Sequence, residues 1–152
     1  MKKIKFENKF FLITSPSNKS ALGIFKEGKI VKLNHQEEHP YGIRPKNLGQ
    51  KFLLEALLDD TCSLVVVKGN AGTGKTFCTL AAGLQRIEKE VYSRILVTRS
   101  VTATEQYGFL PGDIEEKLSP YLAGIKDNLA ILVNGSKKNK AGDNSNYEDG
   151  RY

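Results

Sequence analysis

Two runs of β-branched apolar residues dominate the hydrophobic pattern of this chain. They occupy Ser63–Lys68 (SLVVVK) and Arg94–Thr98 (RILVT). Short continuous apolar runs of this kind are typical of strands that are buried on both faces of a parallel sheet. Between them, Lys75–Glu90 has the composition of a helix. This order predicts a right-handed strand, helix, strand crossover, and therefore an α/β fold built on a parallel sheet with flanking helices.

The first forty residues follow a different pattern. Apolar residues within Phe6–Thr14 lead into Ser15–Asn18 (SPSN), which is a turn by composition. Two further short runs, Ala21–Phe25 and Lys29–Leu33, flank a turn that contains Gly28. This spacing predicts a β-hairpin with the glycine at a position of positive φ. We therefore expect residues 1–40 to form a small β element.

Helical spacing marks two further parts of the chain. Leucines recur at helical intervals in Phe52–Leu58, which predicts a helix that ends at Asp59 and Asp60. An apolar run before two aspartates can also be a Walker B strand, but the spacing and the position of this run favour the helix. Later, Asp113 with Glu116 forms a capping pattern, and a second helix is expected to start at Ser119-Pro120 and to run to about Val133.

Composition indicates one ordinary domain. Of the 152 residues, 39% are hydrophobic and 26% are charged, and the net charge is +6. A basic chain favours a polyanionic partner such as nucleic acid, although its lysines are spread along the chain, which a lysine-rich soluble surface would explain equally well. No membrane span is present, and Phe10–Ile13 is too short for the apolar core of a signal peptide, so we expect a cytoplasmic protein.

The loop between the first apolar run and the helix carries the candidate chemistry. It fits G-x-x-x-x-G-K-[ST], the phosphate-binding P-loop or Walker A motif. Its glycines allow backbone N–H groups to converge on a β-phosphate, with the positive end of the following helix behind them. Lysine then reaches the β- and γ-phosphates, and threonine binds Mg²⁺. We expect ATP and Mg²⁺ to be bound by Gly69, Asn70, Ala71, Gly72, Thr73, Gly74, Lys75 and Thr76, with Lys75 and Thr76 also acting in catalysis.

One segment imitates a metal site. His35-Gln36-Glu37-Glu38-His39 matches H-x-x-E-H, a zinc peptidase signature that needs both histidines on one helix face. Pro40 takes His39 out of helical geometry, and no third ligand is apparent, so we interpret the segment as a solvated linker.

Four segments together resemble the PhoH-like family of P-loop ATPases, relatives of superfamily 1 helicases. They are YGIRPKNLGQ (Tyr41–Gln50), the loop GNAGTGKT, the strand ILVTRS and GFLPGDIEEKLSPY. The resemblance covers roughly residues 20–133, and GFLPGD..EK..PY is its most specific part. It implies a RecA-like or superfamily 1 helicase-like P-loop fold. The β element resembles the connector that, in longer members, joins a ribonuclease domain to the ATPase.

The resemblance also implies roles for particular residues. Gln50 lies about 19 residues before the loop, where its amide would contact the adenine base, and Arg99 and Ser100 would face the nucleic-acid side. Ser100 stands where the family usually has proline. The implied partners are RNA or single-stranded nucleic acid and further copies of the chain in a ring, since these ATPases complete each site with a neighbour's arginine.

The same comparison sets an expectation about catalysis. No apolar run ending in Asp-Glu, the Walker B strand, follows the loop, and neither a polar sensor nor an arginine finger is apparent. We expect residues 41–135 to be the N-terminal half of the ATPase domain and residues 136–152 to be a flexible polar tail. ATP binding with doubtful hydrolysis follows. Two alternatives are a truncated protein that binds nucleotide in a regulatory role and a P-loop kinase of small substrates, against which GFLPGD..EK..PY argues.

Overall fold

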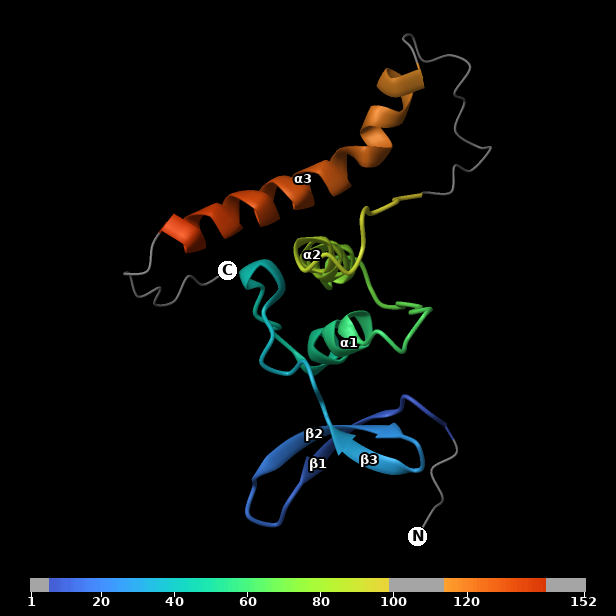
Figure 1. The fold of residues 1–152 in the computed structure, drawn as a ribbon, viewed down its shortest axis with the longest axis vertical. Coiled ribbons are helices and arrows are strands. Elements are labelled where there is room, and N and C mark those ends of the chain that lie inside the picture. Colours follow the sequence, from blue (N-terminus) through green and yellow to red (C-terminus); the bar gives the residue numbers. More distant parts are fainter. Residues whose placement is uncertain (1–5, 99–113, 142–152) are drawn as a thin grey trace. The chain divides into compact units, whose positions relative to one another are not determined.

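The computed structural model describes residues 6–98 and 114–141, and for residues 114–121 and 136–141 it describes the backbone alone. Within these residues the chain forms a small antiparallel sheet, three α-helices and a short 3-10 helix (Figure 1). The chain divides into two compact units, Met1–Glu38 with Pro45–Lys68 and His39–Arg44 with Gly69–Tyr152. The division into residues 1–40, 41–135 and 136–152 stays a prediction.

The first unit contains a three-stranded antiparallel sheet in the order β1-β2-β3, made of β1 (Phe10–Thr14), β2 (Ser20–Lys26) and β3 (Lys29–Lys32). Glu27 and Gly28 join β2 to β3, with φ angles of 51° and 80°. Positive φ at both central residues gives the turn a twist that matches the twist of the strands, and glycine takes up this conformation without steric cost. The predicted hairpin is confirmed.

One face of this sheet packs on α1 (Leu48–Leu58). Leu22, Ile24 and Leu33 are buried there, and Phe10 stacks on Phe52 of the helix with ring centroids 4.7 Å apart. Because alternate residues of a strand point to opposite faces, the even-numbered positions of β1 and β2 build this core.

A buried carboxylate ties the chain after β3 to the helix. Glu55 of α1 is 4% exposed, and its two oxygens accept the backbone N–H groups of Asn34 and His35, each at 2.8 Å. A buried carboxylate is costly unless it is hydrogen-bonded, so these two bonds are what make Glu55 tolerable in the core. They also fix the path of the chain as it leaves the sheet.

The C-terminal end of α1 lies where the sequence predicts it, at Asp59. The Asp59 carboxylate pairs with Lys26 of β2 and also accepts the backbone N–H and the hydroxyl of Thr61. Burial alone raises the pKa of the Asp59 carboxyl, but the hydrogen bonds from Lys26 and Thr61 outweigh burial and hold this pKa below its ordinary value.

The second unit contains η1 (Pro40–Gly42), α2 (Lys75–Glu88) and α3 (Ile114–Ala141). Leu80 and Ala81 of α2 and Leu132 of α3 are buried together, with Tyr41 and Ile43 packed against them. Cys78 of α2 is also buried, which raises the pKa of its thiol. The helix predicted at Lys75–Glu90 is confirmed. None of the helices within the described residues is long and apolar enough to cross a membrane.

The chain leaves α2 through Glu90, which has a φ of 58°. The N–H of Glu90 donates to the carbonyl oxygen of Ile87 and the N–H of Val91 to that of Arg86, both at 2.9 Å. These two bonds make a Schellman motif, in which glycine is the usual residue at the left-handed position. The motif turns the chain away from the helix axis at residue 90.

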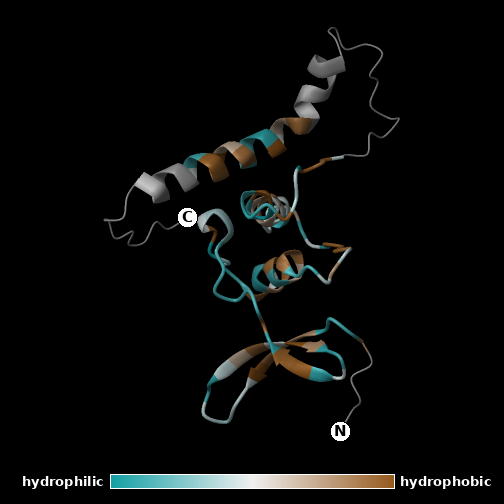
Figure 2. Ribbon diagram, viewed as in Figure 1, coloured by the Kyte–Doolittle hydropathy of each residue, from teal (hydrophilic) through white to brown (hydrophobic). Residues whose placement is uncertain are grey.

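The two apolar runs predicted as buried parallel strands are not strands in this structure. Ser63–Lys68 and Arg94–Thr98 have no strand assignment, and no parallel sheet is formed among the described residues. Leu64 is 79% exposed, Val66 83% and Leu96 76%, and Figure 2 colours both runs as hydrophobic. A buried strand needs hydrogen-bonded neighbours and covered faces, and these runs have neither.

The last helix is longer than the sequence predicts. One helix, α3, runs through Ser119-Pro120, where a second start was expected, and continues past Val133 to Ala141. An interior proline removes one N–H and clashes with the carbonyl one turn earlier, at a cost of about 3 kcal/mol, and Gly135 costs about 1 kcal/mol, yet neither residue is an obligatory stop. Residues 136–141 of the predicted flexible tail are therefore helical, and residues 142–152 lie outside the described residues.

Candidate functional site: the glycine-rich loop before α2

The loop Gly69–Gly74 enters α2 through two residues in the left-handed region. Gly72 has a φ of 74° and Gly74 a φ of 81°, and Gly74 is the N-cap of the helix. A Cβ added at Gly72 would meet no atom within 4 Å, so the backbone conformation, rather than lack of space, is the reason for glycine there. Gly74 has no side chain to cap the first N–H groups of α2, which leaves them for another acceptor.

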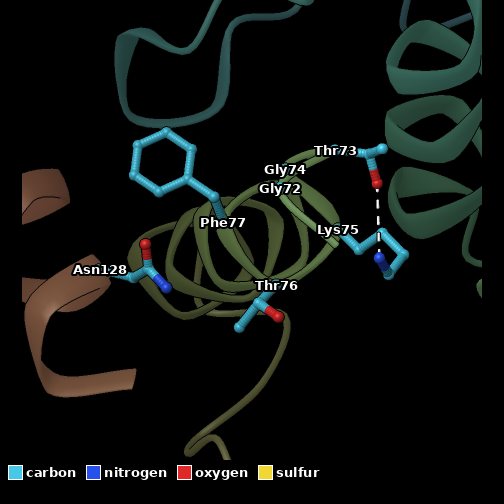
Figure 3. Close-up of a pocket in the computed structure, with 7 residues that line it drawn as sticks. All are labelled: Gly72, Thr73, Gly74, Lys75, Thr76, Phe77 and Asn128. Carbon is cyan, nitrogen blue, oxygen red and sulfur yellow. Dashed lines mark hydrogen bonds between the residues drawn. The ribbon is translucent and has the colours of Figure 1, made fainter. Parts of the chain in front are cut away.

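Lys75, the first residue of α2, folds back over this loop. Its Nζ donates a hydrogen bond to the carbonyl oxygen of Asn70 at 2.6 Å and a longer one to Oγ1 of Thr73 at 3.4 Å, the bond dashed in Figure 3. The Thr73 hydroxyl donates to the same Asn70 oxygen at 2.9 Å. The loop is thus closed on itself by one ammonium group and one hydroxyl.

A cavity of about 300 Å³ opens beside the loop. This is the lower end of the size range of small-molecule sites. Figure 3 shows the loop and the first turn of α2 with Asn128 approaching from α3. Thr76 is exposed at this end of α2. The cavity is lined by Gly72, Thr73, Gly74, Lys75, Thr76, Phe77 and Asn128.

The electrostatics of the cavity favour an anion. The N-terminal end of α2 carries the positive end of the helix dipole, and Lys75 is one of the lining residues. No acidic side chain is among the lining residues. A ligand with several anionic oxygens could therefore accept bonds from the N–H groups of the helix and from Lys75 at the same time.

Asn128 is the lining residue that the sequence analysis missed. Its Nδ2 donates to the carbonyl oxygen of Gly124 one turn earlier in α3, at 2.7 Å. The neighbouring residues Ile125, Leu129 and Leu132 belong to the apolar face that packs against α2. The sequence signal that could have identified Asn128 is a single asparagine on an apolar helix face. Such a residue lies at the rim of a core only where a polar partner can reach it.

Asn47 caps the start of α1 in the first unit, and the side chain of Gln50 bonds to the residue before that cap. Asn47, the N-cap, accepts the N–H of Gln50 at 3.0 Å, and Oε1 of Gln50 accepts the N–H of Lys46 at 2.8 Å. The first of these bonds satisfies an N–H group that the first turn of a helix leaves open. The adenine contact of Gln50 stays a prediction. Arg99 and Ser100 lie outside the described residues.

The H-x-x-E-H segment is a turn and not a helix. Nδ1 of His35 lies 2.6 Å from Oε1 of Glu38, and His39 has φ and ψ of −125° and 78°. Among the described residues, no group of three or more His, Cys, Asp or Glu side chains could hold a metal ion.

Known proteins similar to this chain share one family. The family model described as PhoH-like protein matches residues 42–148. Protein PhoH2 of Bacillus subtilis is 42% identical over 138 residues, which is 87% of this chain and 31% of that protein. Protein PhoH2 of Thermobispora bispora is 32% identical over 75% of this chain, and the PhoH-like protein of Mycobacterium bovis is 42% identical over 60%. No solved structure gives a significant match.

The matched region includes the glycine-rich loop and all of α2 and α3. The chain spans about a third of the length of Bacillus subtilis PhoH2 and about a quarter of the two other relatives. Because the family model covers more than half of these 152 residues, the resemblance seen in the sequence is confirmed, and the chain belongs to the PhoH-like protein family.

Proposed function

We propose that this chain binds Mg-ATP through Gly69–Thr76, as the nucleotide-binding part of a PhoH-like ATPase. The observation that carries the proposal is the geometry of the loop. Two left-handed glycines lead into the uncapped N-terminus of α2, and Lys75 is one of the residues that line the cavity. This is a donor set for a polyphosphate.

Each residue of the loop has a distinct part in this proposal. The N–H groups around Gly72 and Gly74 would donate to the β-phosphate, and Lys75 would hold the β- and γ-phosphates. The hydroxyl of Thr76 is a suitable oxygen ligand for Mg²⁺, which when bound neutralises charge on the β- and γ-phosphates. Oxygen ligands of this type fit Mg²⁺, and Thr76 is exposed at the helix start, where the cation could reach it.

Nucleotide binding requires Lys75 to exchange one hydrogen-bond acceptor for another. Lys75 donates to the carbonyl oxygen of Asn70 in this structure, and it must transfer this bond to a phosphate. A charged phosphate oxygen is a stronger acceptor than a peptide carbonyl, so the exchange favours the nucleotide complex.

The family membership supports a finer statement about the fold. We also propose that the chain adopts the P-loop fold of superfamily 1 helicases when further strands are present. In that state Ser63–Lys68 and Arg94–Thr98 would pair within a parallel sheet and cover side chains that are exposed here, among them Leu64 and Leu96. Burial of each such side chain would contribute roughly 1.5–3 kcal/mol.

We propose that these 152 residues bind ATP, and we do not propose that they hydrolyse it. Phosphoryl transfer depends on positioning the attacking water and on charges at the γ-phosphate. No Walker B aspartate is apparent in the sequence to complete that set, whereas binding needs only the loop. A regulatory binding role is compatible with the same geometry.

Thermal unfolding tests the proposal. A ligand that binds only the native state stabilises it by RT ln(1 + [L]/Kd), about 2.7 kcal/mol at a hundredfold excess over Kd. We expect millimolar Mg-ATP to raise the melting temperature of the unmodified chain and to raise that of Lys75→Ala by no more than about half as much. Lys126→Ala, an exposed lysine of α3 outside the cavity lining, is the matched control and should respond like the unmodified chain. A folded chain that shows no shift would contradict the proposal.

A further inference from the structure

The positive charge of this chain is concentrated in its first 34 residues, which include all three strands of the sheet. Residues 1–34 contain eight lysines and two glutamates, so this segment alone carries the net charge of +6 that the whole chain has. The remaining 118 residues contain fifteen basic and fifteen acidic side chains and are neutral overall. A charge imbalance of this size in a short segment is the electrostatic footprint of a polyanion-binding surface.

Two of these eight lysines, Lys9 and Lys32, lie on one face of the sheet. The face opposite the α1 contact is called the outer face here and carries Lys9, Phe11, Ile13, Ala21, Gly23, Phe25, Ile30 and Lys32, which follows from the alternation of residues along each strand. The side chains of Lys9 and Lys32 are exposed, those of Phe11 and Phe25 are half-buried, and Ile30 is 42% exposed. Aromatic and basic side chains thus share one side of a small antiparallel sheet.

The register places an aromatic ring and a lysine on either side of a glycine. Phe11 of β1 lies opposite Gly23 of β2, and Gly23 lies opposite Lys32 of β3. These three residues form a row across the sheet. The row has no side chain at its centre, and Phe11 and Lys32 stand on strands about 10 Å apart. A Cβ at Gly23 would lie 2.7 Å from Cγ2 of Ile30, so the centre of the row cannot carry a larger residue without moving Ile30.

The acidic residues of this segment are held together at one end of the sheet. Oε2 of Glu7 accepts the N–H of Glu27 in the β2–β3 turn at 3.0 Å. Lys26, on the face that packs on α1, is paired with Asp59. The outer face itself has no carboxylate among the residues defined above, so its lysines are not neutralised by carboxylates of that face.

We propose that the outer face of this sheet binds single-stranded nucleic acid, with Phe11 as a stacking platform for a base and Lys9 and Lys32 as phosphate contacts. The combination of charge and rings selects this partner. A phosphate backbone accounts for the lysines, and exposed bases account for the half-buried rings between them. The proposal does not depend on nucleotide binding at the loop of α2.

One contact on the outer face competes with a base. Nζ of Lys9 lies over the ring of Phe11, 5.8 Å from its centroid. An exposed cation–π contact of this kind is worth about 0.5–1 kcal/mol, and stacking of a base on an aromatic ring about 1–3 kcal/mol. The base therefore displaces the ammonium, which then becomes available to the adjacent phosphate.

The test is a titration of the whole chain into a 5′-fluorescein-labelled twelve-nucleotide oligouridylate, followed by fluorescence anisotropy without ATP. Neutralising two phosphates of a single strand, one by each lysine, should weaken binding about sevenfold between 50 and 200 mM salt. Phe11→Leu should weaken binding about tenfold and Phe11→Tyr, which keeps the ring, should bind as the unmodified chain does. Circular dichroism confirms that each variant is folded.

Two lysines of the same strand provide the matched pair. Lys32→Glu and Lys29→Glu change the net charge equally, but Lys29 points to the opposite face of β3. We expect Lys32→Glu to weaken binding at least tenfold and Lys29→Glu to weaken it less than threefold, while Lys126→Ala, on α3, leaves it unchanged. No binding at 50 mM salt, or equal effects of the two β3 variants, or no effect of Phe11→Leu, would overturn the proposal. Binding that depends on both β3 lysines but not on the ring would instead indicate a non-specific anion surface.

Discussion

Lys75 donates a hydrogen bond to the carbonyl oxygen of Asn70, five residues earlier, and so spans the loop in which both lie. This bond contributes little to folding, because an exposed bond of this kind replaces one to water. We predict that Lys75→Ala changes the free energy of unfolding of the unliganded chain by no more than about 1 kcal/mol. Urea unfolding without nucleotide measures this. A larger loss would mean that the lysine is a structural part of the loop.

The position of Asn128 in the structure predicts that this residue contributes to nucleotide binding. It lines the loop cavity from α3, and loss of one neutral hydrogen bond to a ligand costs about 0.5–1.5 kcal/mol. Asn128→Ala should therefore weaken Mg-ATP binding two- to tenfold in a direct binding measurement. Asn134→Ala, an exposed asparagine of the same helix outside the cavity lining, is the control and should change the affinity less than twofold. Equal effects of the two variants would remove Asn128 from the site.

Gln50 has a structural role at the start of α1 and a predicted role in binding adenine, and two variants separate these roles. Asn47→Ala removes the cap of α1 and should lower the free energy of unfolding by about 1 kcal/mol without changing nucleotide preference. Gln50→Ala should in addition abolish a preference for ATP over GTP, because its amide matches the donor and acceptor edge of adenine. Competition between the two nucleotides reports the preference. Equal affinity of the unmodified chain for ATP and GTP would contradict the adenine contact.

The ion pair of Asp59 with Lys26 predicts a pH dependence of stability. Because the pKa of Asp59 is lower in the folded chain than in the unfolded chain, its contribution is complete above the ordinary carboxyl pKa of about 3.9. The contribution is lost as the pH falls through the lower pKa of the folded state. The difference in urea midpoint between the unmodified chain and Asp59→Asn should thus be constant from pH 7 to pH 5 and should shrink below pH 4.

A matched carboxylate controls for general acid effects on that measurement. Asp127 is exposed on α3, in the other unit. Asp127→Asn should show a small difference from the unmodified chain at every pH. If the Asp59→Asn difference persisted unchanged at pH 3, the stabilising partner would not be the ionised carboxylate.

Local patterns predicted the elements that depend on local chemistry. The turn at Gly28, the helix that ends at Asp59 and the start of α2 at Lys75 all lie where the sequence places them. In each case the signal is a residue whose backbone or side chain acts within one turn of its own position, such as glycine at positive φ. The glycine-rich loop was identified for the same reason.

Features that depend on distant partners were not predicted. Val66 belongs to a run with every sequence property of a buried strand, yet it is 83% exposed, because strand formation requires neighbours that a local pattern does not contain. Asn128 could not be assigned to the loop from the sequence, since its role follows from the packing of α3 on α2. Pro120 was read as a helix start, and the helix passes through it.

The most direct test of the central claim is isothermal titration of the folded chain with Mg-ATP. The account predicts saturable binding with one site per chain. Lys75→Ala should bind at least tenfold more weakly, as expected for loss of a charge-assisted hydrogen bond of about 1.5–3 kcal/mol, and Lys126→Ala should bind with unchanged affinity. Absence of saturable binding by the unmodified chain, or equal affinities of the chain and its Lys75→Ala variant, would contradict the assignment of Gly69–Thr76 as the nucleotide site.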